Sequence, residues 1–515
     1  MSDNTNKTKR IVKNTIVLYV RMIVIMLITL YSSRIILQAL GIDDYGLSNV
    51  VGGVVLLLGF LRNSLTSSTQ RFLSFELGKK DEIRLKRVFS ICFSTHVLIS
   101  LVIIFLAETI GLWFLNTNVQ IPDGRELAAN YVYQFSVLSL ALSVITVPYH
   151  ACTISHEKMS FFAWVSILDA VLKLIFAIAL LRASCDRLIL YSGLLMLTNV
   201  INFILYWIYV RRNFIEARYK YVWDKEMFKQ IFSFSGWTIW GQLAVVFSTQ
   251  GKSVLINIFY TVTVNAAMGV AQQVNAALVS LTSNFQTAFQ PQLTKAYASK
   301  DYGYLKSLMY SASKMSYFLL FLASFPIMLN IEWILGIWLV KVPDFSGTFC
   351  ILYIIASTLN ALATPLWITI FATGNIKNYQ ISLSFAYFAE ILVIYILFKI
   401  GFPPTTAMVV KVALNTFMVI LRLLFAKKTI EFFSIYDYMR NVIAPLFIST
   451  SVTLLLSFAL YNYVDFNVEN KWLNTCLAVV ISLMSAYYIG LTRKERVSIA
   501  GMIIRIINRK LSINK

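Results

Sequence analysis

The stretch NTIVLYVRMIVIMLITLYSSRIILQALGIDDYG, residues 14–46, decides the fold class of this chain. Its first part, residues 14–38, is a long apolar run in which Arg21 and Arg34 are the only charged residues. About twenty apolar residues in a helix cross a hydrocarbon core of roughly 30 Å, so this run is long enough to span a membrane. It is also too long for the apolar core of a signal peptide. We therefore predict a first helix that stays in the membrane.

Runs of the same kind follow along the whole chain. Of its 515 residues, 58% are hydrophobic and 13% are charged, and the mean hydropathy is +0.70. A soluble domain carries about 25% charged residues, so the composition predicts an all-α integral membrane protein. No segment between the runs is long enough for a soluble catalytic domain. The fourteen transmembrane helices are expected at residues 14–38, 45–66, 88–110, 128–150, 163–181, 188–210, 232–258, 265–289, 307–329, 347–371, 380–398, 405–426, 441–461 and 472–491.

Lys and Arg are distributed unequally between the two sets of connecting segments. If the N-terminus is cytoplasmic, the segments on the cytoplasmic side contain 31 of these residues and those on the other side contain 6. Because basic residues stay on the cytoplasmic side of a membrane, this predicts that both termini are cytoplasmic. We expect a multi-pass protein of a bacterial inner membrane. The net charge of +21 then reflects orientation in the membrane, and no nucleic-acid partner is expected.

An internal repeat relates the two halves of the chain. QRFL at 70–73 precedes KD at 80–81, and QPQL at 290–293 precedes KD at 300–301, an offset of 220 residues. A second pair of segments, GLW and GIW, lies after the equivalent helices of each half, at 111–113 and 336–338. Parallel repeats of six helices are a transporter architecture with the substrate path between two lobes. The predicted domains are an N-lobe at 1–210, a cytoplasmic linker at 211–231, a C-lobe at 232–426, and two further helices with a basic cytoplasmic tail at 427–515.

Charged residues inside the predicted helices point to the site. Such residues cost at least a few kcal/mol at the centre of a span, so they usually face a cavity or a partner. Asp169 and Lys173 are one helical turn apart and are expected to pair. Near helix ends, long side chains reach the headgroups, and we expect this of Arg21, Lys314, Arg422 and Glu108. The remaining cations, which have no obvious partner on their own helices, are Arg34, Arg62, Lys252 and Lys411.

These four cations predict a cavity that binds an anionic substrate. Pyrophosphate is the favoured group, because a guanidinium donates to two phosphate oxygens at once. The helix at 265–289 adds a polar stripe about 100° wide, since unsatisfied amides are not tolerated against lipid. This stripe is suited to sugar hydroxyls, although hydrogen bonding between helices would also explain it. Its members are Asn265, Gln272, Asn275, Thr282 and Gln286.

No catalytic, cofactor or metal site is expected. The five cysteines are far apart with no CxxC pair, and the histidines lack metal-site spacing. Asp43 and Asp44, in the first external loop, could hold a metal in a membrane glycosyltransferase. Such an enzyme needs large external loops, which this chain does not have. The pair is therefore interpreted as a polar turn, and the protein as a transporter rather than an enzyme.

Two motifs carry a resemblance to a known superfamily. They are LGIDDYG at 40–46, and RFLS at 71–74 followed by GKKD at 78–81. With the features above, the chain resembles the multidrug/oligosaccharidyl-lipid/polysaccharide (MOP) exporter superfamily, and within it the Wzx-like flippases of polysaccharide repeat units, over residues 10–430. The resemblance implies a V-shaped pair of six-helix lobes and alternating access. The implied function is transfer of undecaprenyl-pyrophosphate-linked oligosaccharide to the periplasmic leaflet for O-antigen, capsule or exopolysaccharide synthesis, beside a polymerase and export machinery.

The alternatives are a cation-coupled multidrug antiporter, a lipid II flippase, and a flippase or scramblase without sugar specificity. The antiporter would need an acidic residue in the first or seventh helix, where this chain has cations. The lipid II flippases of the superfamily use cations on the first, second and eighth helices. Arg34 and Arg62 match the first two, but here the third cation is Lys252 on the seventh helix. No motif names the glycan or the energy source.

Overall fold

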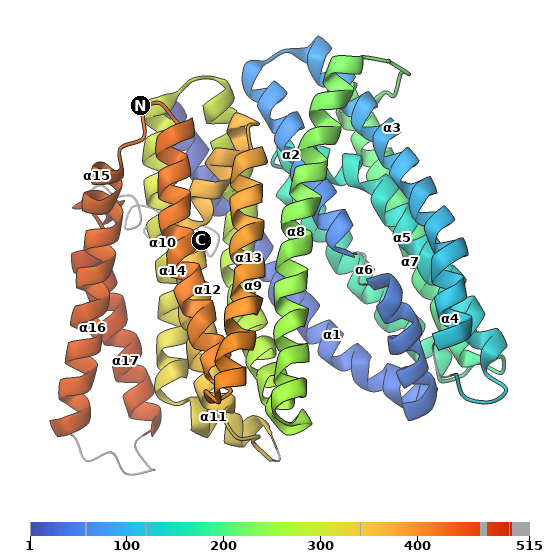
Figure 1. The fold of residues 1–515 in the computed structure, drawn as a ribbon. Helices are drawn as coiled ribbons and strands as arrows, with labels where there is room; N and C mark the ends of the chain where they lie inside the picture. The colour runs from blue at the N-terminus through green and yellow to red at the C-terminus, as the bar shows by residue number, and fades with distance from the viewer. Residues whose placement is uncertain are drawn as a thin grey trace, which may run out of the picture. The chain divides into compact units, whose positions relative to one another are not determined.

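In the computed structural model, which describes residues 2–56, 59–118, 121–339, 341–463, 471–493 and 495–496, every regular element is a helix (Figure 1). The first half contains α1 (Ser2–Leu56), α2 (Gly59–Lys79), α3 (Glu82–Leu106), η1 (Ala107–Gly111), α4 (Leu112–Asn118), α5 (Glu126–Ser155), α6 (Met159–Leu180), α7 (Arg187–Asn213) and η2 (Ile215–Ala217). The second half contains α8 (Lys225–Phe259), α9 (Val262–Ala298), α10 (Tyr302–Leu329), α11 (Ile331–Trp338), α12 (Ser346–Thr373), α13 (Lys377–Ile400) and α14 (Thr406–Thr429). The chain continues with α15 (Ile435–Tyr438), η3 (Met439–Ile443), α16 (Ala444–Tyr463), α17 (Lys471–Ser485) and η5 (Ala486–Gly490).

Eleven helices in the described ranges are long and apolar enough to cross a membrane, and a shorter apolar helix covers Thr475–Gly490. The prediction of an all-α membrane protein is therefore confirmed. Two of the fourteen expected spans, 45–66 and 265–289, correspond to the end of α1 with α2 and to α9. The helix at 265–289 is absent from the eleven because its amide and hydroxyl residues lower its hydropathy, whereas the span 45–66 includes residues 57–58, which lie outside the described ranges. Both segments also carry residues that we predicted to contact substrate.

The chain forms two compact units. Unit 1 contains residues up to Val246 together with Thr287–Lys300 and Gly374–Ile381. In it, α5 packs against α7, α2 and α3, and α1 packs against α6 (Figure 1). Unit 2 contains Phe247–Gln286, Asp301–Thr373 and the residues from Ser382 onward. In it, α12 packs against α10 and α14, while α17 packs against α16 and α10.

The kink in α1 lies in the motif that supports the superfamily resemblance. Gly41 has φ 79° and ψ 175° there, a conformation that is essentially restricted to glycine and costs other residues about 1–3 kcal/mol. Just after it, Asp44 accepts hydrogen bonds from Arg125, at 2.9 Å from its Nε. Arg125 also donates to Asp186, at 2.6 Å, and Asp186 caps the start of α7. Arg125 thus joins α1 to the start of α7 through Asp44 and Asp186, which agrees with a structural role for Asp44.

Turns at matching positions support the internal repeat. Lys80 and Lys300 are both left-handed, with φ of 59° and 58°, although neither is glycine. In each turn the next residue caps the following helix: Asp81 accepts from the backbone N–H of Arg84 at 2.9 Å, and Asp301 from that of Tyr304 at 3.2 Å. The same turn, a left-handed lysine followed by an aspartate that caps the next helix, therefore occurs twice at an offset of 220 residues.

Two polar segments expected between helices are largely helical. The segment 67–87 stays helical up to Lys79, and 290–306 stays helical up to Ala298. Several polar residues of these helical parts are buried within unit 1, as shown by Ser74 and Thr294, which are 0% and 3% exposed. At these positions, polar side chains therefore indicate that the helix packs against other helices, and they do not indicate a loop.

Two of the cations expected to reach the headgroups instead have partners inside unit 2. Lys314 is buried and forms an ion pair with Glu495. Arg422 is also buried, and its Nη1 donates to Asn360 Oδ1 at 2.9 Å. The snorkelling prediction is therefore wrong for both residues, because each finds a polar partner on another segment. The expected pair on α6 is confirmed, with Lys173 Nζ 2.8 Å from Asp169 Oδ2.

Candidate functional site

Unit 1 contains a group of polar and aromatic side chains that we call the arginine cluster: Arg21, Arg62, His150, Phe162 and Tyr206. The Arg21 guanidinium lies 4.3 Å from the centroid of the Phe162 ring. The His150 ring lies 5.1 Å from Phe162 and 5.6 Å from Tyr206, both edge to face. Arg21 and Arg62 are both close enough to His150 and Tyr206 to interact with them electrostatically. Residues of five helices, α1, α2, α5, α6 and α7, therefore form the cluster, in which both arginines interact with His150 and Tyr206, Arg21 being half-buried and Arg62 exposed.

The choice between the two arginines of α1 differs from the sequence-based prediction. We expected Arg21 to reach the headgroups and Arg34 to line the cavity. In the structure Arg21, like Arg62, interacts with His150 and Tyr206, whereas Arg34 is not among the charges that act on these two residues. Both Arg34 and Arg62 are exposed. The thirteen residues from Arg21 to Arg34 turn the helix by about 140°, so a single face cannot present both. Tertiary packing selects Arg21.

Unit 2 contains a second charged group, the lysine–glutamate triad of Lys252, Glu390 and Lys411. Lys252 Nζ is 2.8 Å from Glu390 Oε1, and both side chains are fully buried. Ser248, one turn before Lys252 on α8, accepts from Lys252 Nζ at 2.7 Å and donates to Glu390. Lys411 interacts electrostatically with both partners and lies 5.0 Å from the centre of the Tyr353 ring. With all three groups ionised, the triad has one net positive charge.

The expectation that Lys252 is unpaired is therefore wrong. It has no carboxylate on its own helix, but α13 supplies Glu390. Only the packing of α13 against α8 could reveal this pair, since the two residues are 138 positions apart. Lys411 of α14 supplies the positive charge that remains. The structure thus groups the four predicted cations as Arg62 in unit 1, Lys252 and Lys411 in unit 2, and Arg34 outside both groups.

The polar stripe of α9 is partly used for packing. Asn265 Oδ1 accepts from Ser253 Oγ at 2.8 Å, which ties α9 to α8 as an inter-helix hydrogen bond. Asn275 differs, because its buried Oδ1 has no hydrogen-bond partner among the described residues. Gln272 and Gln286 are both half-buried. An unsatisfied buried amide oxygen is costly, so Asn275 is the member of the stripe best suited to a ligand hydroxyl.

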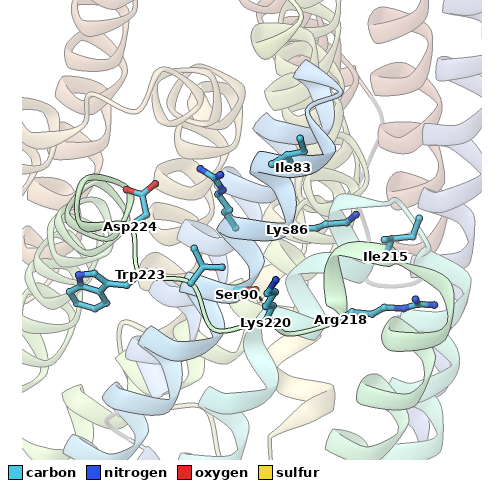
Figure 2. A pocket seen from close by; sticks show the side chains of 10 residues that line it. Ile83, Lys86, Ser90, Ile215, Arg218, Lys220, Trp223 and Asp224 are labelled. Carbon is cyan, nitrogen blue, oxygen red and sulfur yellow. Dashed lines mark hydrogen bonds between the residues drawn. The ribbon is translucent and has the colours of Figure 1, made fainter.

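A basic cavity of about 900 Å³ lies in unit 1 between α3 and the segment that follows α7. Figure 2 shows Lys86 and Ser90 projecting from α3, with Arg218 and Lys220 facing them from the connecting segment. The segment is fixed to α3 by the Lys220 backbone N–H, 3.5 Å from Ser90 Oγ, and by Tyr219, whose hydroxyl is 3.1 Å from that of Ser94. The cavity presents positive charge beside the exposed indole of Trp223.

A carboxylate network at the turn between α5 and α6 was not anticipated. Glu157 is buried, and its carboxylate accepts from Lys295 Nζ at 2.7 Å and from Gln292 Nε2 at 3.0 Å. Arg10 of α1 lies 3.5 Å from the same carboxylate. The network therefore joins α1 and the α5–α6 turn to the end of α9, which is the part of α9 that belongs to unit 1. Glu157 shows no signal in the sequence, because its partners come from distant segments.

Comparison with known proteins identifies the family. A family model described as polysaccharide biosynthesis protein matches residues 11–297, which is more than half of the chain. The chain belongs to this family. The family is part of the MOP superfamily, so the sequence-based resemblance is confirmed. No curated protein matches the sequence.

Solved structures of multidrug and toxic compound extrusion (MATE) transporters have the same fold as this family member. A MATE protein in a bent conformation has a TM-score of 0.70 at 15% identity, covering 82% of this chain and 95% of the other. A MOP superfamily transporter from Pyrococcus furiosus has a TM-score of 0.69 at 15% identity, with the same coverage of 82% and 95%. A Vibrio cholerae MATE transporter has a TM-score of 0.67 at 13% identity, covering 85% and 100%. At these identities the likeness shows the fold alone.

The Glu157 network makes stability depend on pH. Burial raises the pKa of Glu157, but Lys295, Gln292 and Arg10 together outweigh it, so the pKa lies below its ordinary value of 4.5. Because the carboxylate has a lower pKa in the folded state than in the unfolded state, its ionised form stabilises the fold at pH values above the unfolded-state pKa. This stabilisation is lost as the pH falls through the folded-state pKa. Glu157→Gln should destabilise the protein by about 1–3 kcal/mol at neutral pH. Thermal unfolding in detergent should show the gap to wild type closing below pH 4.5; a gap independent of pH would contradict this.

Gly374, between α12 and α13, should tolerate no side chain. Its φ is +85°, and a Cβ there would lie 2.7 Å from Nη2 of Arg71, which is buried and packed on Phe72 and Phe75. Gly401 is the matched control, with φ +96° and no atom within 4 Å of the position that a Cβ would occupy. Both alanine variants incur the backbone strain of about 1–2 kcal/mol. Thermal unfolding should show Gly374→Ala to be the less stable by at least ~1 kcal/mol, and equal stability would contradict the Arg71 contact.

Proposed function

We propose that this protein is a flippase that moves undecaprenyl-pyrophosphate-linked oligosaccharide repeat units from the cytoplasmic to the periplasmic leaflet of a bacterial inner membrane. The product serves the synthesis of O-antigen, capsule or exopolysaccharide. The observation that carries the proposal is the presence of Arg21 and Arg62 around the same two residues, His150 and Tyr206, in a member of the polysaccharide biosynthesis family. Two guanidinium groups in one cluster suit the two phosphates of a lipid pyrophosphate.

Further features agree with this substrate. The lysine–glutamate triad has a net positive charge, and Asn275 holds an unsatisfied amide oxygen suited to a sugar hydroxyl. The basic cavity beside Lys86 lies at the end of unit 1 that loop charges predict to be cytoplasmic. A lipid pyrophosphate made on the cytoplasmic leaflet would meet this charge first, because basic clusters beside a membrane concentrate anionic headgroups.

The charge of the described groups supports a flippase over an exporter of cationic drugs. The Pyrococcus furiosus transporter of the same fold is described as having a binding pocket of reverse polarity that suggests a different function. The fold therefore accommodates pockets of different charge. In this chain, the described groups around Arg21 and around Lys252 each carry excess positive charge, which favours an anion over a cationic drug.

The function is tested by deleting the gene and following the lipid-linked oligosaccharide. A flippase predicts that the oligosaccharide accumulates on the cytoplasmic leaflet, where it is shielded from periplasmic ligation, and that the wild-type gene restores export. Unchanged polysaccharide export in the deletion strain, with no redundant flippase, would exclude the function. Accumulation without recovery by wild type would show that the effect comes from elsewhere.

A cation-coupled multidrug antiporter is a second candidate that one observation favours. The sequence shows no acidic residue in the first or seventh helix, but the structure places Glu390 against Lys252 of α8. A buried carboxylate of this kind could carry a coupling proton. The two functions separate in one experiment: export of cationic dyes by inverted vesicles under a proton gradient supports the antiporter, whereas dependence of polysaccharide export on the gene supports the flippase.

A further inference from the structure

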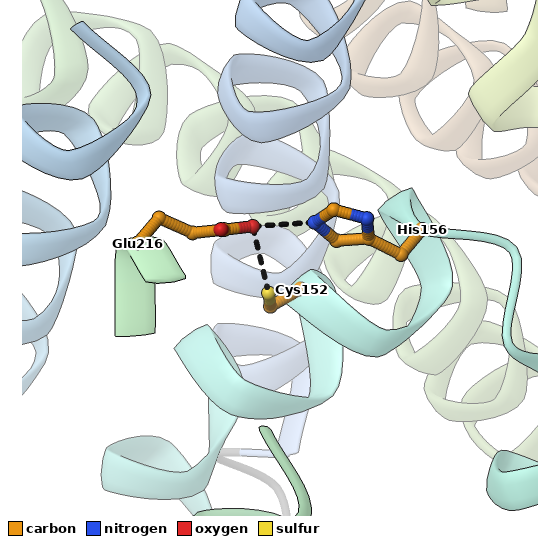
Figure 3. A group of neighbouring side chains, drawn as sticks. All are labelled: Cys152, His156 and Glu216. Carbon is orange, nitrogen blue, oxygen red and sulfur yellow. Dashed lines mark hydrogen bonds and ion pairs between the residues drawn. The ribbon is translucent and has the colours of Figure 1, made fainter. Parts of the chain in front are cut away.

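Three side chains with metal-binding atoms converge where α5 ends. Cys152 and His156 are one helical turn apart, and Glu216 reaches them from η2, the short helix after α7 (Figure 3). Their ligand atoms all lie within 4.8 Å of one another. Glu216 Oε1 is 3.6 Å from Cys152 Sγ and accepts a hydrogen bond from His156 Nε2. None of the three belongs to the arginine cluster or to the lysine–glutamate triad.

We propose that Cys152, His156 and Glu216 form a binding site for a divalent transition metal of the zinc class. Thiolate, imidazole and carboxylate are the three donors that zinc uses in proteins, and the soft thiolate disfavours Mg²⁺ and Ca²⁺. Three protein ligands leave the fourth tetrahedral position for water.

The geometry requires only a small adjustment. Bonds of about 2.3 Å to sulfur and about 2.0–2.2 Å to oxygen, at the tetrahedral angle, place these two ligand atoms about 3.5 Å apart. The observed separation of Cys152 Sγ and Glu216 Oε1 is 3.6 Å. The metal would replace the hydrogen bond between His156 and Glu216, so the imidazole has to move away from the carboxylate. His156 can do so along the face of the Phe214 ring, on which it stacks at 4.0 Å.

The charges also balance. A divalent ion with one thiolate, one carboxylate and one neutral imidazole has zero net charge. This matters because Cys152 is 0% exposed and Glu216 is 5% exposed, and an uncompensated charge there would be costly. The ion releases the Cys152 proton to solvent, through the half-exposed His156 side, when the thiolate binds.

Metal binding would also organise the basic cavity. Ile215 and Arg218, on either side of Glu216 in the chain, line that cavity. Fixing Glu216 to the end of α5 would therefore hold this wall in place. Because the site depends on ligand chemistry rather than on the transported substrate, its test is independent of the proposed function.

The full-length protein, purified in detergent and treated with chelator, should be titrated with Co²⁺ and observed by absorption spectroscopy. We expect about one tightly bound Co²⁺ with a thiolate-to-cobalt charge-transfer band, and displacement by Zn²⁺. Cys152→Ser should abolish the band. His156→Gln and Glu216→Gln should each weaken binding by more than about 100-fold, since even outer-shell changes cost 10–100-fold.

Cys92→Ser is the matched control, because Cys92 is equally buried but belongs to no such group. It should leave the band and the affinity unchanged. A band that survives in Cys152→Ser, or wild-type protein without a band, would overturn the proposal. If Cys152→Ser does not fold, the two variants that keep the thiol decide the question: unchanged Co²⁺ affinity in both would equally overturn it.

Discussion

Replacing Glu390 by glutamine should destabilise unit 2 by roughly 3–5 kcal/mol, because it leaves the Lys252 ammonium buried without its counter-charge. Glu390 is the carboxylate partner of Lys252 in the structure, and both side chains are fully buried. The nearby Lys411 makes the loss greater, since two like charges then remain. Thermal unfolding and the yield of monodisperse protein in detergent measure the effect.

A double variant provides the control. Replacing both partners by apolar residues of similar size removes the buried charges, and such replacements are often neutral or stabilising by about 1–4 kcal/mol. Lys252→Met with Glu390→Leu should therefore recover most of the stability that Glu390→Gln loses. If Lys252 also binds substrate, this stable double variant should still fail to restore polysaccharide export. If Glu390→Gln is as stable as wild type, the buried ion pair between Lys252 and Glu390 is contradicted.

Arg21→Ala and Arg62→Ala should each reduce oligosaccharide transfer about 10–100-fold, because each removes a charge-assisted contact to phosphate of about 1.5–3 kcal/mol. Rates should be measured as the appearance of the oligosaccharide on the periplasmic leaflet in cells with matched amounts of folded protein. Arg62→Lys should retain part of the rate, since the charge remains but the two-pronged geometry is lost.

Arg34→Ala is the matched control, as Arg34 lies on the same helix as Arg21 but outside the arginine cluster. We expect it to change the rate less than about twofold, because Arg34 lies about 140° around α1 from Arg21. A larger loss in Arg34→Ala than in Arg21→Ala would show that the substrate meets the other face of α1. Full activity of an Arg21→Ala/Arg62→Ala double variant would refute the arginine cluster as the binding site.

The candidate site was only partly predictable from sequence. The presence of Arg62, Lys252 and Lys411 within apolar segments was visible, because an ionisable residue stands out against its neighbours. Which of them have partners was not visible. Glu390 lies 138 residues from Lys252, and helical periodicity on one segment cannot reveal a partner on another.

The proposed metal site formed by Cys152, His156 and Glu216 was also not predictable from the sequence. Histidine spacing alone does not reveal it, because the partners of His156 are a cysteine one turn earlier and a glutamate 60 residues later. A Cys-x-x-x-His pattern at a helix end was the one local signal available. By itself, that pattern is too common to support a site.

The sequence by itself determined that this protein is a helical membrane protein built from a repeated half. Long apolar runs such as residues 14–38 allow little else, since the bilayer requires each backbone group to be satisfied within its own helix. The turns at Lys80 and Lys300 agree with the repeat in backbone conformation. Only the tertiary structure decided that Arg21 rather than Arg34 shares neighbours with Arg62, and that Lys252 is paired. The physical reason is that hydropathy is a property of each segment, whereas charge pairing depends on which faces of separate helices meet.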